Sequence, residues 1–428
     1  MSDDGEEDEE YGDTGDTGIF DTDTEETSDS WCDRLSSSCG GICIGLLFFF
    51  GAFPLLFWNE GRAVERYDTL NEGQSITKPI SVESIDPTNQ GELVYFSAPV
   101  RSTGNITDPI FGISTDDLKL ARDVEIYQWT QKVQNKKQKN VGGSTTTTKT
   151  YSYSKEWLTY VVDSANFKRS GEHNNTGSLL VPQMSVASDD ITVGAFQLPQ
   201  ELIDRISWYQ PLAGGVVSKD SITDSVLRAK AIEYNSGFYF GINNVTDMSS
   251  PVIGDVRVSF NVVPSGGIIS VIAQQSGNTF TSYEAKAGGS LLLFERGYHP
   301  AEALYTQAAS DNKVVTWLLR FAGFFVMGLG MYLVLRPIEV FADVLPCVGG
   351  IVGFGIKIVA FVVTGLLSGL TIAIAWLIHH PIIGIVVLVV SISITAAIAF
   401  LVKRCQSKNK EKGLDSDDGD LELSPEEE

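Results

Sequence analysis

The chain alternates between long apolar runs and long polar stretches. One apolar run covers residues 40–58, and residues 59–313 contain no comparable run. Three more apolar runs follow within residues 314–402. Each run approaches or exceeds the roughly 20 residues that a helix needs to cross a bilayer. The pattern predicts an integral membrane protein in which one large polar domain lies between a single span and a cluster of three.

Length and charge set the boundaries within the cluster. The second predicted span covers residues 314–335. The run from 348 to 378 is too long for one span, because a helix of that length reaches about 46 Å across a hydrocarbon core of about 30 Å. Starting a span at Lys357 keeps its amine out of the bilayer centre, where a charge costs about 2.5–3.5 kcal/mol. We therefore predict an interfacial or re-entrant segment at 336–356, a third span at 357–378, a turn at 379–381 and a fourth span at 382–402.

Basic residues near the spans predict the orientation. Residues 403–412 are rich in Lys and Arg, whereas the short turn at 379–381 has none. Because basic loops stay on the cytosolic side, both termini and residues 336–356 are expected in the cytosol, and residues 59–313 in the lumen. Arg62, Arg66 and Lys313 favour the opposite orientation. Three sequons, the glycosylation candidates Asn105, Asn174 and Asn244, fall in the predicted luminal part.

The acidic charge of the chain is concentrated at its ends. The chain has 54 Asp and Glu against 31 Lys and Arg, and neither residues 1–30 nor residues 413–428 contain a base. We expect an acidic disordered cytosolic tail over 1–39 and a basic-then-acidic cytosolic tail over 403–428. Nucleic acid is not an expected partner, because its binding needs a basic footprint.

The polar domain is rich in strand patterns. It has no cysteine, so no disulfide framework is expected there. Residues 132–149 predict a long hairpin whose tip is Gly142-Gly143, and helices are predicted over 199–206 and 300–309. The domain is therefore expected to be mixed α+β and dominated by antiparallel strands. Strands are predicted at 92–100, 124–133, 145–153, 191–198, 255–263, 268–274, 279–283 and 291–295.

The sequence contains no pattern typical of an enzyme site. P-loop, dinucleotide-binding, HExxH and nucleophile-elbow motifs are all missing. No catalytic residue, cofactor or metal is predicted. We interpret His173 and His299 as exposed structural residues, and the pair His379-His380 as part of an interfacial turn.

Polar and small residues near the membrane are the remaining candidates. Arg320 either extends to the interface or pairs within the helix bundle. Asp343 and Lys357 are further polar candidates at the interface. Gly365, Ser368 and Gly369 have the small-residue spacing that suits helix packing or self-association.

Ten short segments carry a resemblance to a known family, and they occur in the family's order and spacing. With them the chain resembles the LUMA family, also called transmembrane protein 43, over nearly all of residues 58–402. The segments are WNEGRAV at 58–64, DPIFGI at 108–113, DVEIYQW at 123–129, YSYSKEW at 151–157, ANFKR at 165–169, GDVRVSF at 254–260, SLLLFERG at 290–297, TWLLRFAG at 316–323, DVLPCVG at 343–349 and AWLIHHP at 375–381.

The resemblance implies a four-span protein of the endoplasmic reticulum and inner nuclear membrane with a large luminal domain. It implies self-association, binding to nuclear-envelope membrane proteins and lamins, and links to complex assembly and lipid handling. It implies no enzymatic activity. The tails of this chain depart from those of the familiar animal members, so we do not carry lamin binding over to it.

The expected fold is an integral membrane α-helical protein with four spans and a large β-rich α+β luminal domain between the first two. The leading hypothesis is a non-enzymatic scaffold that self-associates and organises membrane-protein complexes at the nuclear envelope. The alternative is a membrane-embedded lipid-handling protein or enzyme that uses Arg320, Asp343 and Lys357. A channel or transporter subunit fits less well, since the spans carry few charges and no inverted repeat.

Overall fold

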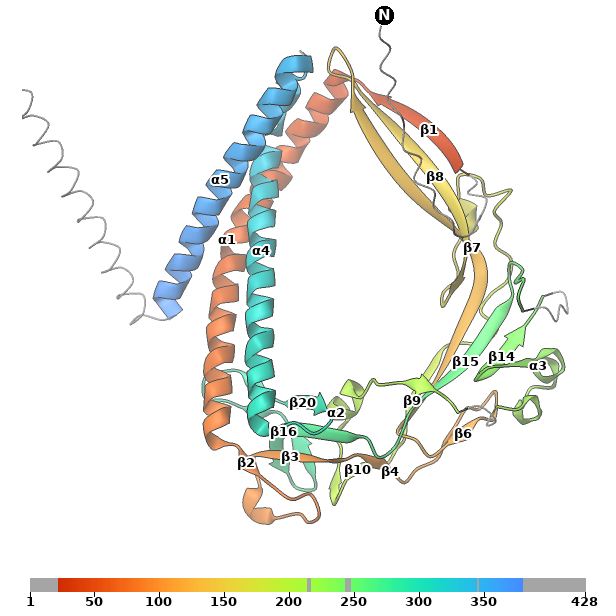
Figure 1. The fold of residues 1–428 in the computed structure, drawn as a ribbon. Helices are drawn as coiled ribbons and strands as arrows, with labels where there is room; N and C mark the ends of the chain where they lie inside the picture. The colour runs from red at the N-terminus through yellow and green to blue at the C-terminus, as the bar shows by residue number, and fades with distance from the viewer. Residues whose placement is uncertain (1–21, 214–216, 243–247, 345, 380–428) are drawn as a thin grey trace, which may run out of the picture.

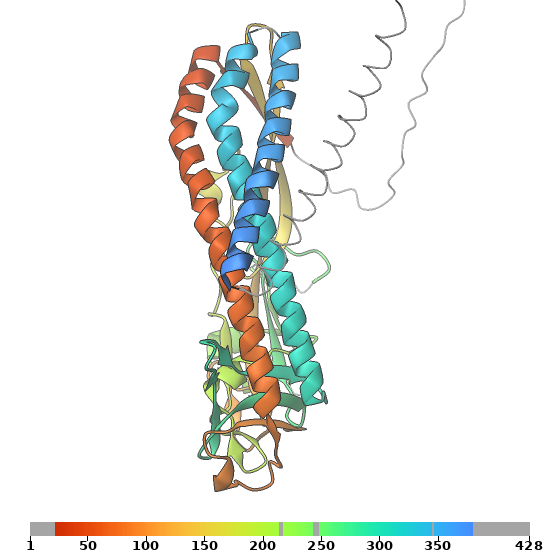
Figure 2. The same cartoon turned by 90° about the vertical axis from the view of Figure 1, so that its left-hand side faces the viewer.

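Three long helices stand side by side, and a β region starts and finishes at one end of them (Figures 1 and 2). The computed structural model describes residues 22–213, 217–242, 248–344 and 346–379. The helices are α1 (Trp31–Ile76), α2 (Gln200–Arg205), α3 (Ser225–Lys230), α4 (Ala301–Ala342) and α5 (Pro346–His379), with the 3-10 turns η1 (Pro87–Asn89), η2 (Ser164–Asn166) and η3 (Lys219–Ser221).

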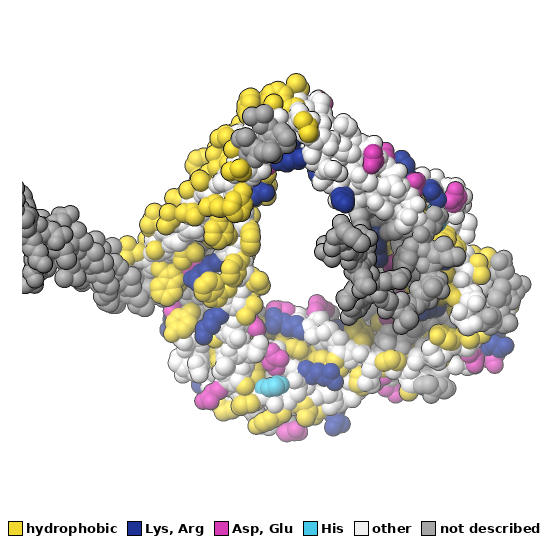
Figure 3. All heavy atoms as spheres, turned by 45° about the horizontal axis from the view of Figure 1, so that its top comes forward, with side chains coloured by type: hydrophobic (Ala, Val, Ile, Leu, Met, Phe, Trp, Pro, Cys, Tyr) yellow, Lys and Arg dark blue, Asp and Glu magenta, His cyan; other side chains and the backbone are white. Residues whose placement is uncertain are grey.

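Helices α1, α4 and α5 are long and apolar enough to cross a membrane. The first two predicted spans lie inside α1 and α4. Large apolar side chains on all three helices are exposed, among them Phe50, Leu318 and Leu366. In the space-filling view hydrophobic side chains cover the helical side of the molecule (Figure 3). The predicted fourth span at 382–402 and the tail at 403–428 lie outside the described residues.

The predicted third span at 357–378 lies inside a longer helix, and the segment before it is helical too. Helix α4 continues through Pro337 to Ala342, and α5 runs without a break from Pro346 through Lys357. Proline suits the first turn of a helix, where its missing N–H would have no partner. The chain therefore turns around Asp343, and no re-entrant break occurs in the described part of 336–356. Lys357 is exposed on α5, where a long side chain can extend along the helix.

Helix α1 extends well beyond its apolar run. Ser30 caps it, with its side chain accepting a hydrogen bond from the backbone N–H of Asp33 at 3.2 Å. Its 46 residues correspond to a length of about 69 Å. The C-terminal half of α1 and the N-terminal part of α4 reach past the apolar runs and pack on the β region.

Helices α1 and α4 are antiparallel and touch closely at glycines. A Cβ added to Gly330 would lie 2.5 Å from the backbone nitrogen of Phe49 and 2.6 Å from the carbonyl oxygen of Gly45. A Cβ on Gly45 would meet the carbonyl oxygen of Gly330 at 2.8 Å. Further along, Gly323 accommodates the buried Leu56. Close backbone contact through small residues is the usual way in which membrane helices associate.

Within the described residues the strands form two main sheets and three small pairings, and each of these pairings is antiparallel except that of β2 with β3. The larger sheet has the order β1-β8-β7-β15-β14-β13, with β9 beside β7 and β12 beside β15; the second has the order β17-β16-β3-β2, with β20 beside β16. Their bounds are β1 (Thr22–Asp29), β2 (Lys78–Pro79), β3 (Leu93–Pro99), β7 (Lys119–Lys139), β8 (Thr145–Leu158), β9 (Met184–Ala187), β12 (Gln210–Pro211), β13 (Ile232–Tyr234), β14 (Gly237–Phe240), β15 (Val256–Val263), β16 (Ile268–Ser276), β17 (Thr279–Thr281) and β20 (Leu293–Arg296).

The small pairings are β10 with β4 and β11, β5 with β6, and β18 with β19. Each of the eight predicted strand segments contains strand residues, but 191–198, 279–283 and 291–295 are each divided between two strands. The two predicted helices correspond to α2 and the start of α4. The bounds of these strands are β4 (Arg101–Ser102), β5 (Ile106–Thr107), β6 (Ser114–Thr115), β10 (Ile191–Val193), β11 (Phe196–Gln197), β18 (Tyr283–Glu284) and β19 (Ser290–Leu291).

Strands β7 and β8 form the predicted hairpin, which is a long arm beside the helices (Figure 1). Gly142 and Gly143 at its tip have φ of +87° and +82°, which glycine adopts without strain. The 21 residues of β7 span about 69 Å, which matches the length of α1. The arm meets the helices at its tip, and an opening remains between arm and helices in the space-filling view (Figure 3).

The prediction of a disordered tail over 1–39 is wrong for residues 22–39. Residues 22–29 form β1 on the edge of β8, and α1 starts at Trp31. Glu25 accepts a hydrogen bond from Tyr151 at 2.9 Å and pairs with Lys168 at 3.1 Å. These contacts hold the pKa of Glu25 below its ordinary value. The acidic strand β1 is ordered because it pairs with the edge of β8, where hydroxyl groups and the nearby Lys168 bind its carboxylates.

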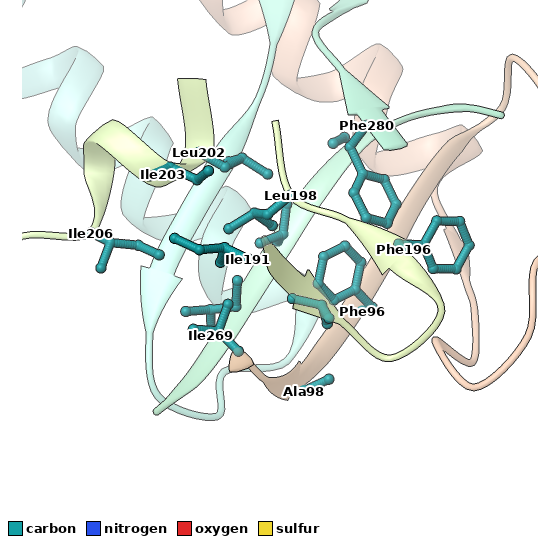
Figure 4. Packing of buried hydrophobic residues seen from close by; sticks show 14 of the residues in the cluster. Phe96, Ala98, Ile191, Phe196, Leu198, Leu202, Ile203, Ile206, Ile269 and Phe280 are labelled. Carbon is teal, nitrogen blue, oxygen red and sulfur yellow. The ribbon is translucent and has the colours of Figure 1, made fainter. Parts of the chain in front are cut away.

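Separate hydrophobic cores hold the β region and join it to the helices. The core of the second sheet packs Phe96, Phe196 and Phe280 against residues from α2 (Figure 4). Another hydrophobic cluster joins α1 and α4 to that sheet. Within it, the hydroxyl groups of Tyr305 and Thr77 are hydrogen-bonded at 2.6 Å. The ends of α1 and α4 are therefore fixed to the β region.

Replacing Gly330 by alanine should destabilise the helix pair. The added methyl group overlaps backbone atoms of α1, which a rotamer change cannot relieve, and overpacking of this kind costs about 1–3 kcal/mol. Gly51→Ala is the matched control, because a Cβ at Gly51 meets nothing within 4 Å. The thermal unfolding midpoint in detergent should fall for the first variant only. Equal midpoints would contradict the close contact.

Candidate functional site

A buried ion pair joins the three long helices near one end of their apolar runs. The guanidinium of Arg320 on α4 donates to both carboxylate oxygens of Glu60 on α1, at 2.7 and 2.6 Å. Trp376 on α5 donates its indole N–H to the same carboxylate at 2.9 Å. The Glu60 side chain is 1% exposed and that of Arg320 18%. Of the two placements considered for Arg320, the structure has the one within the bundle.

The antiparallel helices bring these charges to the same depth. Glu60 follows the first apolar run by two residues, and Arg320 lies six residues into the second. The Arg320 guanidinium carbon also lies 4.9 Å from the ring centroid of Trp317. Desolvated charges of this kind are tolerated only when both partners are present, since either one alone would be a buried uncompensated charge.

One cavity borders the ion pair, and a second shares a wall residue with the first. The first, of about 380 Å³, has Tyr67, Trp317, Trp376 and Lys313 in its wall. The other, of about 320 Å³, has the three arginines Arg62, Arg66 and Arg205 in its wall, together with residues 292–295 of the β region. Asn312 contributes to both walls.

A second polar cluster lies at the opposite end of the helices, where the tip of the arm meets them. Asp343 binds Arg34 at 2.6 Å and Lys139 of β7 at 3.0 Å, and Lys139 also binds Glu339 at 2.9 Å. Trp31 donates its indole N–H to the carbonyl oxygen of Val340 at 2.8 Å. Burial by itself would lower the pKa of Lys139, but its hydrogen bonds to Glu339 and Asp343 raise it.

Glycines on α5 make room for this cluster. A Cβ on Gly349 would lie 2.3 Å from a carboxylate oxygen of Asp343, and one on Gly353 would lie 2.8 Å from a carboxylate oxygen of Glu339. Any larger residue at either position would therefore displace a charged side chain. The Gly-x-x-x-Gly spacing here serves polar packing between α4 and α5.

The arm and the predicted topology disagree at this point. The tip at Gly143 is predicted to be luminal, yet it contacts Trp31 and Arg34, which are predicted to be cytosolic. A bilayer around the apolar runs would place the middle of the arm at the depth of the hydrocarbon. A sheet with open edges does not occur in contact with lipid, because its backbone groups would be unpaired. The tip contact and a bilayer around α1 and α4 therefore exclude one another.

The three polar candidates from the sequence do not converge. Arg320 and Asp343 are 23 residues apart along α4 and its C-cap, a distance of about 35 Å. Lys357 is exposed and forms no ion pair among the described residues. A single site built from these three side chains is therefore not present.

The small-residue candidates and the sequons are placed as follows. Ser368 is buried, whereas Gly365 and Gly369 are exposed, and a Cβ on Gly369 would meet nothing within 4 Å. Asn105 and Asn174 are both exposed. Asn244 lies outside the described residues.

His173 is buried, so its prediction as an exposed loop residue is wrong. Its ring stacks on Tyr153 with centroids 3.8 Å apart and meets the edge of Trp129 at 4.6 Å. His299 is partly exposed, and His379 packs against Phe57. No group of three or more His, Cys, Asp and Glu side chains suited to a metal ion occurs within the described residues.

Glu60 is the important residue that the sequence analysis missed. The signal was available, because Glu60 lies just beyond one apolar run and an opposite charge, Arg320, lies just inside another. Two such charges on neighbouring antiparallel spans are expected to pair.

Comparisons with known proteins agree over most of the chain. The family model described as Transmembrane protein 43 matches residues 126–381. Proteins named Transmembrane protein 43 from Rattus norvegicus and Homo sapiens are 33% and 32% identical, covering 84% and 82% of this chain and 89% and 87% of their own length. The Transmembrane protein 43 homolog of Drosophila melanogaster is 27% identical over 79% of this chain and 89% of its own length. No solved structure matches.

Glu60→Gln should destabilise the bundle, because it leaves the Arg320 guanidinium partly buried without a counter-charge. Breaking a buried pair in this way costs about 3–5 kcal/mol. The double variant Glu60→Gln/Arg320→Met should recover much of this loss in detergent unfolding measurements. A single variant as stable as the unchanged protein would show that the pair is not formed.

Proposed function

Because this chain belongs to the transmembrane protein 43 family, we propose that it is a non-enzymatic scaffold of the endoplasmic reticulum and inner nuclear membrane. In this role it self-associates and organises membrane-protein complexes at the nuclear envelope. One observation carries the proposal. Helices α1 and α4 continue beyond their apolar runs and are fixed to the second β-sheet by the cluster around Tyr305. The β region is thus fixed to the helices that carry the apolar runs, which supports a scaffold role.

The proposed surface for self-association is the exposed side of α5 around Gly369. Leu366 and Leu370 next to it are 70% and 57% exposed, and Gly369 leaves room for a second helix. Small residues flanked by large apolar ones suit close packing between membrane helices. A second copy of this chain is the proposed occupant.

The proposed topology keeps both termini in the cytosol or nucleoplasm and residues 59–313 in the lumen. The antiparallel arrangement of α1 and α4 supports a single side for this region, because it leaves one helix and enters the next at the same end. Exposure of Asn105 and Asn174 supports luminal placement, since both can accept a glycan. In a bilayer the tip of the arm then separates from Trp31, Arg34 and Asp343.

The alternative of an enzyme built from Arg320, Asp343 and Lys357 has less support. Arg320 is occupied by Glu60, and Asp343 lies at the far end of α4. No observation favours a reaction at these residues.

Two differently tagged copies of the chain should co-purify from cells that express them at native levels. Gly369→Leu should greatly reduce this recovery, because the larger side chain closes the proposed helix-packing surface. Gly350→Leu, at the other end of the same helix and also without neighbours within 4 Å, is the control and should leave recovery unchanged. Recovery of neither a second copy nor nuclear-envelope proteins would refute the scaffold proposal.

A sequon engineered at the tip of the arm tests the topology. With Asn replacing Gly142 and Thr replacing Ser144, the tip should receive a glycan that endoglycosidase H removes, as should the exposed Asn105. Such a glycan requires a luminal tip separated from Arg34. An unmodified tip together with a glycosylated Asn105 would instead favour an arm whose tip stays in contact with Trp31 and Arg34. That result would contradict the proposed insertion of α1 and α4 in the bilayer.

A further inference from the structure

Three arginines from two separate parts of the chain surround one cavity. Arg62 and Arg66 lie one turn apart on α1, and Arg205 comes from the end of α2. The cavity of about 320 Å³ also has Val315 and Ala308 of α4 in its wall. The packing of α1 against α4 does not depend on these three arginines, and none of them takes part in the ion pair of Glu60 with Arg320.

The guanidiniums are held in place mainly by neutral acceptors. Arg62 donates to the side chains of Asn312 at 3.0 Å and Thr316 at 2.9 Å, and Arg66 donates to the carbonyl oxygen of Ser290 at 2.7 Å. Within the described part of the chain, neither arginine forms an ion pair. The buried Nε of Arg62 has no hydrogen-bond partner. Each guanidinium has five N–H donors, so both retain unused donors.

Arg205 differs from the other two arginines, because it has a carboxylate partner. It donates to the carbonyl oxygen of Leu292 at 2.8 Å and pairs with Glu201 at 3.2 Å. Burial is the main influence that lowers the pKa of Arg66, and repulsion by Arg205 and Arg62 lowers it further, whereas Tyr305 acts in the opposite direction.

Two carboxylates also reach the wall of the cavity. Asp311 is exposed and accepts a hydrogen bond from Gln307 at 2.9 Å, and Glu295 is half-buried. Within the described residues neither forms an ion pair. They limit the net positive charge, so the cavity suits one small anion rather than a polyanion.

Measured from the end of the first apolar run, Arg62 falls at the depth of lipid headgroups and Arg66 falls just beyond that layer. Arg62 and Arg66 follow the end of the first apolar run by about 6 and 12 Å along α1. Val315 belongs to the second apolar run, so the wall of the cavity continues into the membrane part of α4. The headgroup layer extends about 5–8 Å beyond the hydrocarbon on each side.

We propose that this cavity binds a single phosphate group, presented either by a phospholipid or by a soluble phosphate compound. Guanidiniums match the oxygens of phosphate with paired N–H donors, and such charge-assisted bonds are stronger than neutral ones. The phosphate would satisfy the unused donors of Arg62 and Arg66 and remove their mutual repulsion. The apolar wall next to Val315 leaves room for the glycerol and upper acyl chain of a lipid.

Thermal unfolding of the purified full chain in dodecyl maltoside tests the proposal at constant ionic strength. The probes are dioctanoyl phosphatidic acid, dioctanoylglycerol, which has the same chains without phosphate, and inorganic phosphate. Phosphatidic acid should raise the unfolding midpoint and dioctanoylglycerol should not. An equal effect of inorganic phosphate identifies a soluble ligand, and an effect of phosphatidic acid alone identifies a lipid.

Variants connect the effect to the cavity. Arg66→Gln and Arg205→Gln should each raise the phosphate concentration at half-maximal stabilisation by about tenfold or more. Arg66→Lys keeps the positive charge but loses the paired N–H donors of the guanidinium. Its phosphate concentration at half-maximal stabilisation should therefore lie between those of the unchanged protein and Arg66→Gln. Lys357→Gln removes the same charge from an exposed position on α5 and should have no effect. If Arg66→Gln does not fold, Arg205→Gln on the partly exposed α2 decides.

Three results would overturn the site. The first is equal stabilisation by phosphatidic acid and dioctanoylglycerol, which would mean that the chains alone bind. The second is no stabilisation by either phosphate probe. The third is the same concentration dependence in the arginine variants and in Lys357→Gln.

Discussion

Helices α1 and α4 touch backbone to backbone where Gly45 meets Gly330, and the charges of the helix bundle lie opposite one another because of this contact. The close approach places Glu60 opposite Arg320, and α5 joins the pair through Trp376. It also brings the connected ends of α1 and α4 together, so that the β region begins and finishes at one place. Without the glycine contact the charges of the bundle would have no partners at the same depth.

The local parts of the fold could be predicted from the sequence, and the long-range parts could not. Strand periodicity and the glycines at 142 and 143 were sufficient for the β7–β8 hairpin. The order of β1 was missed because it depends on Lys168 and Tyr151, more than a hundred residues away. His173 has polar neighbours in the sequence, but strands β7 and β8 bury it between Trp129 and Tyr153.

The candidate site shows the same division. Arg320 was recognised because a charge inside an apolar run is costly, whereas its partner Glu60 required knowledge of which helices are neighbours. The arginine cavity combines α1 with α2, which are far apart in the sequence. Conversely, Lys357 was given too much weight, because a lysine on the exposed side of a helix does not mark a boundary. That the arm and α1 have equal lengths is likewise visible only in the folded chain. A bilayer around α1 and α4 would have to separate the tip of the arm from the start of α1.

Disulfide formation between Gly41→Cys and Leu333→Cys in native membranes tests the helix pair most directly, in a background where the natural cysteines are replaced by serine. These positions lie one turn from the glycine contact, and a Cβ at Gly41 meets the side chain of Leu333 at 3.9 Å without overlap. We expect cross-linking within a single chain, and none for Gly51→Cys paired with Leu333→Cys. No cross-link at 41 and 333, or one formed only between two chains, would contradict the helix pair.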